Sequence, residues 1–168
     1  MTPSTDKASP SELEDALLRL TRSISFCNAR YRVVADKAVA HLGLSEAATW
    51  PLVAVARYGD GLRQGVIADV LGIKAPSLAK PLEQLEREGL IERRDDPLDG
   101  RAKTLHLTDA GRELCGRIEA VLTQLRAQLL DGADPLDVQA CLRVFGRLED
   151  RLGRVQHDMA PVEGANRP

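Results

Sequence analysis

The sequence predicts a mainly α-helical protein with one small β-hairpin. Two observations support this fold class. Long stretches near both ends of the chain carry apolar residues at intervals of three and four, which is the spacing of one helix face. Between them, residues 61–111 alternate short apolar runs with glycine and proline, which mark turns between short elements.

The N-terminal part predicts a tail and two helices. Residues 1–9 are small and polar, and we expect them to be disordered. From Ser11 onward, apolar residues repeat every seven positions over three heptads, which predicts a long helix that packs on a partner. These positions are Leu13, Leu17, Leu20, Ile24, Cys27, Tyr31 and Val34. A second helix should run from its N-cap Ser45 to Gly59, with a bend at Pro51.

A helix–turn–helix pattern follows. One apolar-periodic run covers residues 64–71 and stops at Gly72, and the next begins after Ile73. Pro76 lies near the first turn of the second run, where a missing N–H costs nothing. One face of this second helix carries Leu78, Leu82 and Leu85. The other face carries Ser77, Lys80, Pro81 and Gln84 and is available for a ligand.

A β-hairpin is predicted after Gly89, because this glycine suits the left-handed C-cap of the preceding helix. Residues 90–94 and 103–107 form its strands, and DDPLDG lies in a long tip. Thr108 then suits the N-cap of a new helix, with Asp109 in its first turn. A helix–turn–helix followed by a hairpin predicts a winged helix-turn-helix lobe.

These elements indicate DNA binding. The second helix of a helix–turn–helix enters the major groove, and a basic hairpin beside it can reach phosphates or the minor groove. Ser77 and Gln84 can form hydrogen bonds with base edges, while Lys74 and Lys80 can contact bases or phosphates. Arg101 is long enough to enter a narrow groove.

The run LGIKAPSLAKPLEQLEREGLIERRDDPLDGRAKTLHLTDAG resembles the DNA-binding lobe of the MarR/SlyA transcriptional regulators, over about residues 44–114. It shares their PSL-type recognition helix, LE-x-x-GL-I-x-R, D-x-R wing and LT-x-x-G. The resemblance implies that Asp99 and Arg101 pair across the wing tip and present the arginine to DNA. Gly100 replaces a basic residue that the family often has, and Pro81 should kink the recognition helix. The predicted DNA-binding residues are Lys74, Ser77, Lys80, Pro81, Gln84, Asp99, Arg101 and Lys103.

Two further amphipathic helices are predicted after the wing. The first carries Leu114, Ile118, Val121, Leu125 and Leu129 in one stripe. Asp134 and Pro135 suit the start of the second, whose stripe includes Val138, Cys141, Phe145, Leu148 and Leu152. The three long helices carry more apolar surface than the lobe can cover, so we expect a homodimer. Residues 10–168 are thus predicted to form a single unit, with a lobe at 45–108 and dimerisation helices at 10–43 and 109–158.

Charge and composition narrow the function further. A net charge of −2 argues against a general polyanion binder, because non-specific DNA affinity comes mainly from phosphate neutralisation. From Lys74 to Lys103 the chain holds seven basic and seven acidic residues, so their placement must favour DNA. An aromatic content of 3% argues against single-stranded nucleic acid, which stacks on aromatic rings. Without an apolar membrane-length stretch or a signal peptide, we expect a cytoplasmic location and no membrane partner.

Catalytic and metal sites are not predicted. The sequence contains no phosphate-binding loop, G-x-S-x-G, H-E-x-x-H or dinucleotide fingerprint, so no enzyme activity and no cofactor are expected. Cys27, Cys115 and Cys141 form no C-x-x-C and have no histidine at zinc spacing, so reduced thiols are expected. Cys27 and Cys141 fall on helix seams, whereas Cys115 lies beside its stripe and should be more exposed.

We therefore expect a homodimeric repressor that binds an inverted repeat in double-stranded DNA. The resemblance implies release by a small-molecule effector, with aromatic acids as a frequent class, and Trp50 and Tyr31 are the candidate effector contacts. Two alternatives remain open. A redox-switched repressor would use Cys27 or Cys115. A protein-interaction module would dock a partner on the winged helix, although the polar face of the recognition helix favours DNA.

Overall fold

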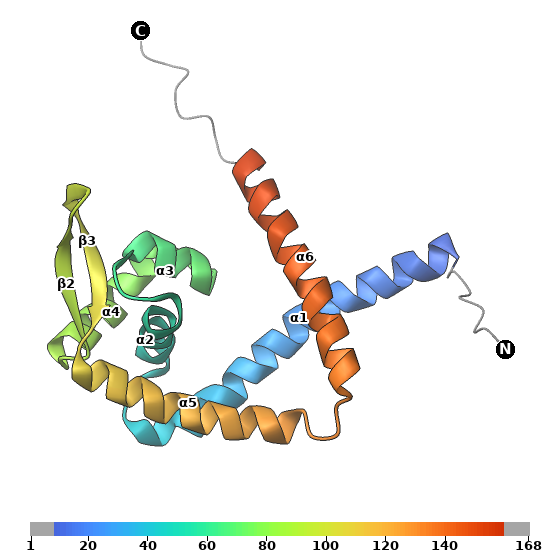
Figure 1. Ribbon diagram of the computed structural model, residues 1–168, viewed down its shortest axis with the longest axis horizontal. Coiled ribbons are helices and arrows are strands. Elements are labelled where there is room, and N and C mark those ends of the chain that lie inside the picture. Colours follow the sequence, from blue (N-terminus) through green and yellow to red (C-terminus); the bar gives the residue numbers. More distant parts are fainter. Residues whose placement is uncertain (1–8, 160–168) are drawn as a thin grey trace, which may run out of the picture. The chain divides into compact units, whose positions relative to one another are not determined.

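The computed structural model describes residues 9–159 and confirms the predicted fold class, a mainly α-helical chain with a small antiparallel sheet (Figure 1). Two of its helices, labelled η, are 3-10 helices. The elements are α1 (Pro10–Val39), η1 (Ala40–Leu42), α2 (Glu46–Tyr58), β1 (Leu62–Arg63), α3 (Gln64–Leu71), η2 (Ala75–Leu78), α4 (Ala79–Arg87), β2 (Ile91–Asp96), β3 (Asp99–Leu107), α5 (Asp109–Leu129) and α6 (Pro135–Met159). The chain divides into two compact units, Met1–Arg126 and Ala127–Pro168.

Helix α1 begins with a capping box that the sequence reading missed. The Glu12 N–H donates to Ser9 Oγ at 3.3 Å, and the Ser9 N–H donates to Glu12 Oε2 at 2.7 Å. This reciprocal pair satisfies two backbone donors that a helix N-terminus leaves free. Ser9, the last residue of the predicted disordered tail, is thus the N-cap of α1, and residues 1–8 of that tail lie outside the described residues. Only Ala35 and Val39 of α1 are buried.

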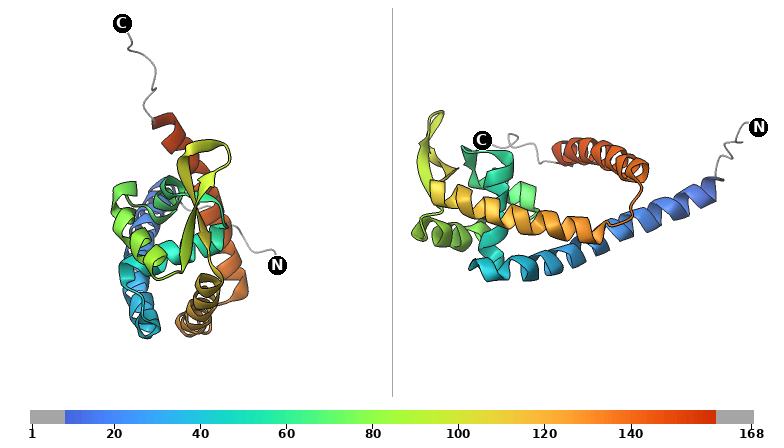
Figure 2. Two further views of the ribbon diagram at one scale, coloured as in Figure 1. Left: turned by 90° about the vertical axis from the view of Figure 1, so that its left-hand side faces the viewer. Right: turned by 60° about the horizontal axis from the view of Figure 1, so that its bottom comes forward.

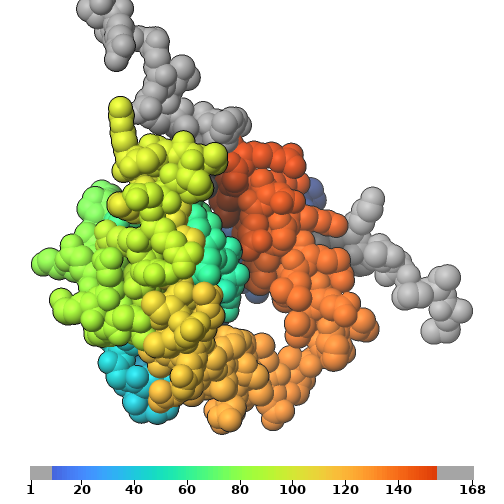
Figure 3. Space-filling model, turned by 60° about the vertical axis from the view of Figure 1, so that its left-hand side comes forward, coloured from blue at the N-terminus to red at the C-terminus, as the bar shows by residue number. Residues whose placement is uncertain are grey.

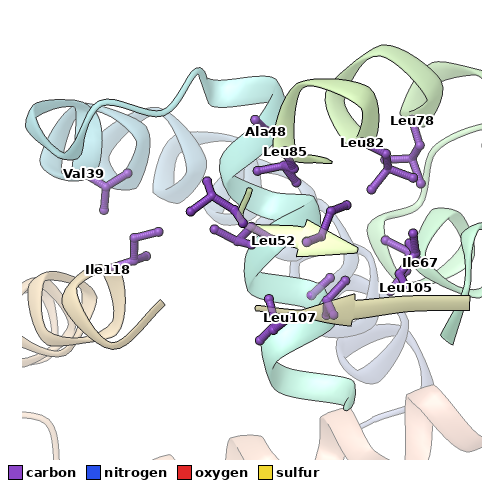
Figure 4. Close-up of a cluster of buried hydrophobic side chains, with 14 of the residues drawn as sticks. Val39, Ala48, Leu52, Ile67, Leu78, Leu82, Leu85, Leu105, Leu107 and Ile118 are labelled. Atoms are coloured by element: carbon purple, nitrogen blue, oxygen red, sulfur yellow. The ribbon is translucent and has the colours of Figure 1, made fainter. Parts of the chain in front are cut away.

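The core of the first unit surrounds α2, which packs against α3, α4 and β3. Leu52 and Val55 of α2 are fully buried, and Figure 4 shows Leu52 among leucines from the neighbouring elements. The other elements contribute Ile67 from α3, Leu78 from η2, Leu82 and Leu85 from α4, Leu105 and Leu107 from β3, and Ile118 and Leu122 from α5. The core is therefore aliphatic, and it fixes the helix–turn–helix on α2.

The ends of α2 are set by Ser45 and Gly59, as predicted, but Ser45 acts through its backbone and not through its side chain. The Ser45 side chain does not cap the helix; its carbonyl oxygen accepts the Ala48 and Thr49 N–H groups at 3.0 Å. Its hydroxyl donates instead to Gln84 Oε1 of α4 at 3.0 Å. Gly59 adopts φ 99°, a value that glycine tolerates, and ends the helix as expected.

The sheet has the order β1-β3-β2 and is antiparallel throughout. The β2–β3 hairpin, the wing, extends beyond the helices of the lobe (Figure 2). The predicted long tip was wrong, because the strands continue through the DD and DGR residues and leave only Pro97 and Leu98 between them. Asp96 closes this short turn by accepting the Leu98 N–H at 2.8 Å. The two-residue strand β1, which pairs Leu62 with Leu105, was not predicted.

Helix α5 begins against the base of the wing. Thr108 caps the helix, because its Oγ1 accepts the Gly111 N–H at 3.0 Å. The Thr108 hydroxyl in turn donates to Gly89 O at 2.6 Å. A Cβ at position 111 would lie 2.0 Å from Leu90 O, so only glycine allows this approach. This contact gives a physical reason for the glycine of LT-x-x-G.

The second unit contains α6, whose start is capped as predicted. The Leu136 N–H donates to Asp134 Oδ1 at 2.7 Å, and Pro135 is the first helical residue. Among residues 9–159, no single helix is long and apolar enough to cross a membrane. The segments Pro10–Leu42 and Glu46–Tyr58 reach that composition only when taken together, as a pair bent by 93°.

Candidate nucleic-acid interface

The recognition segment is formed by η2 and α4. Leu78, Leu82 and Leu85 have no exposed surface, as their shared face predicted. Their burial orients the opposite side of the segment outward, where Ser77 and Lys80 are exposed. Pro81 and Gln84 are only half-buried. The structure thus presents a short polar surface on an element that is anchored along its other side.

Pro81 is the third residue of α4, which follows directly on the 3-10 helix η2. The backbone changes from a 3-10 to an α conformation at Ala79, just before the proline. A proline in the first turn of an α-helix removes no intrahelical hydrogen bond, because the first N–H groups have no partner within the helix. The structure thus shows a change of helix type before Pro81, and the predicted kink stays a prediction.

Gln84 is already engaged within the protein. Its Oε1 accepts the Ser45 hydroxyl at 3.0 Å, and its amide donates to Glu88 Oε1 at 2.9 Å. Gln64 likewise donates to Ala75 O at 2.7 Å and ties α3 to the start of η2. Both glutamines fix the recognition segment on its neighbours. To contact a base, Gln84 would first have to break these bonds.

Ion pairs separate the basic residues of the lobe into two groups. Three are paired: Arg93 with Glu86 at 3.4 Å, Arg94 with Glu92, and Lys103 with Asp95. Between residues 74 and 103, all of which the structure describes, the basic residues without an ion pair are Lys74, Lys80, Arg87 and Arg101. Four cations on and next to the recognition segment and on the wing therefore have no ion pair, as do two carboxylates of the same stretch, Glu83 and Glu88.

The wing tip is organised by Arg63, a residue that the sequence reading missed. Its Nε donates to Asp96 Oδ2 at 2.6 Å, and its Nη1 lies 3.7 Å from Asp99 Oδ2. Asp99 also accepts the backbone N–H of Arg101 at 3.2 Å. The implied Asp99–Arg101 side-chain pair is absent among these described residues, because Arg63 occupies the carboxylate. Arg101 is left exposed and without an ion-pair partner.

The same contacts shift the ionisation of the tip. The Arg63 guanidinium and then the Leu98 N–H lower the pKa of Asp96 from its ordinary value. The bond to Asp96 raises the pKa of Arg63. Both groups therefore stay charged at neutral pH. Arg63 lies in β1, 33 residues before Asp96, so no local sequence motif could predict this ion pair.

Asp60 fastens the base of the wing. It accepts the Leu107 N–H at 2.8 Å through Oδ1 and the Arg112 guanidinium at 2.9 Å through Oδ2. The bond from the Leu107 N–H is the main reason that the pKa of Asp60 is lowered. One carboxylate thus connects the loop before β1, the end of β3 and the first turn of α5.

A cavity of about 410 Å³ lies in the first unit beside Trp50. Its lining consists of Asn28, Arg32, Glu46, Ala47, Trp50, Pro51, Leu71, Ile73 and Ser77. The Arg32 guanidinium stacks over the Trp50 ring at 4.7 Å, and Trp50 Nε1 donates to Asp36 Oδ1 at 2.6 Å. Tyr31 packs against the core and is not part of this lining. The structure therefore places the two candidate effector contacts in different surroundings.

The cysteines differ from expectation in exposure. Cys115 was predicted to be the more exposed but is half-buried, with its thiol 3.8 Å from Leu52 O. It faces α2 because it lies beside the buried Ile118 and Leu122 turns of α5, and burial raises the pKa of its thiol to about 11. Cys27 and Cys141 are exposed. Among residues 9–159, no group of three or more His, Cys, Asp or Glu side chains could hold a metal ion.

Comparison with known proteins agrees with this architecture. The MarR family model matches residues 42–102, which include the recognition segment and the wing tip. The transcriptional regulator PA3341 is 31% identical, with 80% of this chain and 98% of that chain covered at a TM-score of 0.74. CouR from Rhodococcus jostii RHA1, solved with p-coumaroyl-CoA, shares the fold at 22% identity and a TM-score of 0.66, over 74% of this chain and 87% of its own.

Wild-type MarR from E. coli also has this fold. It is 20% identical, with 77% of this chain and 95% of that chain covered at a TM-score of 0.64. The likeness to PA3341 extends over nearly the whole of that regulator, and the family model covers the segment where the polar recognition surface and the wing meet. On these grounds the chain belongs to the MarR family of transcriptional regulators.

Proposed function

We propose that this chain is a homodimeric repressor that binds an inverted repeat in double-stranded DNA and is released by a small-molecule effector. The observation that carries the proposal is the grouping of uncompensated cations on the recognition segment and the wing. Lys74 is the N-cap residue just before the recognition segment, Lys80 lies on this segment, and Arg101 lies on the wing. Such placement provides phosphate and groove contacts without a net positive charge.

Exposed apolar surface supports the homodimer. In the first unit, α1 exposes Leu13, Leu17, Leu18, Leu20 and Phe26. In the second unit, α6 exposes Leu136, Val138, Leu142, Val144 and Leu152. Apolar surface of this extent is uncommon on monomers and marks an interaction site. A second copy of the chain is the economical partner, because a two-fold dimer also suits an inverted repeat.

The cavity beside Trp50 supports an effector site. Arg32 can pair with a carboxylate, and the Trp50 ring and Ile73 provide apolar walls for an aromatic group. Ser77 of the recognition segment also lines the cavity. A ligand bound there would touch an element that contacts DNA, so it could shift the balance between two states that it binds unequally. CouR was solved with an aromatic acyl-CoA, which supports a related ligand class here.

Footprinting over the promoter next to the gene tests the proposal, first without ligand and then with benzoate as the simplest aromatic carboxylate. We expect protection of an inverted repeat that benzoate or a larger aromatic acid weakens. The Arg32→Gln variant should protect the same site and lose the response. Absence of any protected site would contradict the DNA-binding proposal, whereas an equal ligand response in Arg32→Gln would contradict the assigned cavity.

The redox alternative has a separate test. The half-buried thiol of Cys115, with a pKa of about 11, is a poor nucleophile at neutral pH. Cys27 is exposed and free. If mild peroxide released the DNA from the wild-type protein but not from a Cys27→Ser variant, the redox-switched repressor would replace the ligand-switched one.

A further inference from the structure

The wing tip presents one large apolar side chain. Leu98 is 92% exposed, more than any other exposed large hydrophobic side chain in the described part of the chain. It follows Pro97 in the two-residue turn between β2 and β3, and this turn stands out as a narrow projection in the space-filling view (Figure 3). An isolated exposed leucine is ordinary on a flat surface. A leucine on a projecting turn, next to an arginine that is predicted to bind a DNA groove, can enter that groove, whereas a leucine on a flat surface cannot.

The turn that carries Leu98 is fixed rather than free. The Leu98 N–H donates to Asp96 Oδ1 at 2.8 Å, and the other oxygen of this carboxylate accepts Arg63 Nε at 2.6 Å. Asp96 is only 8% exposed, whereas the Arg63 side chain is 46% exposed. Arg63 belongs to β1, which pairs with β3. The backbone of the tip is therefore braced from a neighbouring strand, and less conformational entropy is lost when it binds.

The charges of the wing are arranged so that a polyanion can approach this tip. Lys103 compensates Asp95, and Arg63 compensates both Asp96 and Asp99. Across residues 91–107, every one of which the structure describes, Arg101 is the only Asp, Glu, Lys or Arg without an ion pair. The tip thus combines an apolar side chain with one free cation, although its sequence contains three aspartates.

We propose that Leu98 enters the DNA minor groove as an apolar contact next to Arg101. This inference rests on the proposed DNA-binding function and adds a residue to it. The minor groove has negative potential at narrow sites and apolar sugar edges along its walls, and leucine is among the side chains that proteins insert there. A protein-docking tip would be expected to gather several apolar anchors. In the described hairpin, Leu98 is the one exposed large hydrophobic residue.

The experiment uses full-length protein and a duplex selected by the wild-type protein from a random pool. Leu98→Ser should weaken binding to this duplex by roughly tenfold or more, because the apolar surface of a leucine is no longer buried. The dependence of affinity on salt should stay unchanged, since no phosphate contact is lost. Leu98→Met should retain most of the affinity. Because the Leu98 side chain is almost fully exposed, neither substitution should unfold the protein.

Leu98→Lys separates groove entry from simple proximity to phosphates. A tip that lies over the backbone would bind more tightly with an added cation, whereas an apolar contact would be lost. Tighter binding by Leu98→Lys, or binding by Leu98→Ser within twofold of the wild type, would overturn the inference. Failure of the wild-type protein to select any duplex would instead overturn the proposed function.

Discussion

Arg101 is the residue on which the wing's proposed role depends most. Asp99 accepts its backbone N–H but forms its ion-pair contact with Arg63, so the Arg101 side chain is free to reach a ligand. Lys103, two residues further along β3, is held by Asp95. Two basic residues on one strand therefore have unequal availability for DNA.

Arg101→Ala is expected to weaken binding to the operator by about 1 to 3 kcal/mol, because a minor-groove arginine provides both charge and shape contacts. Lys103→Ala is the matched control and should cost less, since Lys103 is already paired with Asp95 and is less available to DNA. Fluorescence anisotropy with a labelled duplex measures both. Equal affinities for folded Arg101→Ala and wild-type protein would show that the wing does not use this arginine.

Gly111 shows how one missing side chain positions a helix. Gly111→Ala should destabilise the fold by about 3 kcal/mol, because the new Cβ would meet a backbone oxygen that cannot move independently. Gly116→Ala, in the same helix, has open space around the new Cβ and should be neutral or slightly stabilising. Urea unfolding of the two variants provides the comparison. Similar midpoints would mean that α5 can shift away from β2 without cost.

At the scale of elements, local signals predicted boundaries and distant contacts determined the rest. The ends of α3 and α4 followed from Gly72 and Gly89, which adopt φ 66° and 68°. The DNA-binding assignments of the individual residues remain predictions. The length of the wing strands was not predictable, because the charged residues of DDPLDG are typical of a loop. In the fold, Arg63 and Lys103 pair with these aspartates and the strands continue through them. Ser45 and Gln84 are 39 residues apart, so their hydrogen bond could not be inferred either.

The base of the wing should be sensitive to acid. The lowered pKa of Asp60 means that its stabilising effect is complete above the unfolded value of about 4 and is lost as the pH falls through the folded value. Asp60→Asn should therefore be less stable than the wild type at neutral pH, and the difference should narrow in acid. Urea midpoints measured across this range test the sign. A difference that is constant with pH would exclude the carboxylate as its source.

The recognition segment should determine which sequence is bound. Lys80 is exposed, has no ion pair among the described residues and lies on the segment expected in the major groove. Lys80→Ala is expected to change the sequence selected from a random duplex pool, whereas Lys103→Ala should lower affinity without changing it. Identical selected sequences for wild type and Lys80→Ala would remove Lys80 from the base-reading residues.

For the whole molecule, the exposed apolar surfaces of α1 and α6 are the proposed dimer interface. Leu20→Lys should weaken the dimer by several kcal/mol, because an unpaired charge would be buried in the expected interface. Leu98→Lys makes the same chemical change on the wing and should leave the dimer intact. Sedimentation velocity at micromolar concentration distinguishes the two. A Leu20→Lys protein that remains as dimeric as the wild type would place the interface elsewhere.

We expect two copies of this chain to bind one inverted repeat. Sedimentation equilibrium of the wild-type protein with its selected duplex, combined with the sequence of that duplex, tests it most directly. We predict two chains per duplex and half-sites centred roughly 10 bp apart, because a two-fold dimer presents its recognition segments to successive major grooves on one side of the DNA. One chain per duplex, or tight binding to a sequence without two-fold symmetry, would contradict the account.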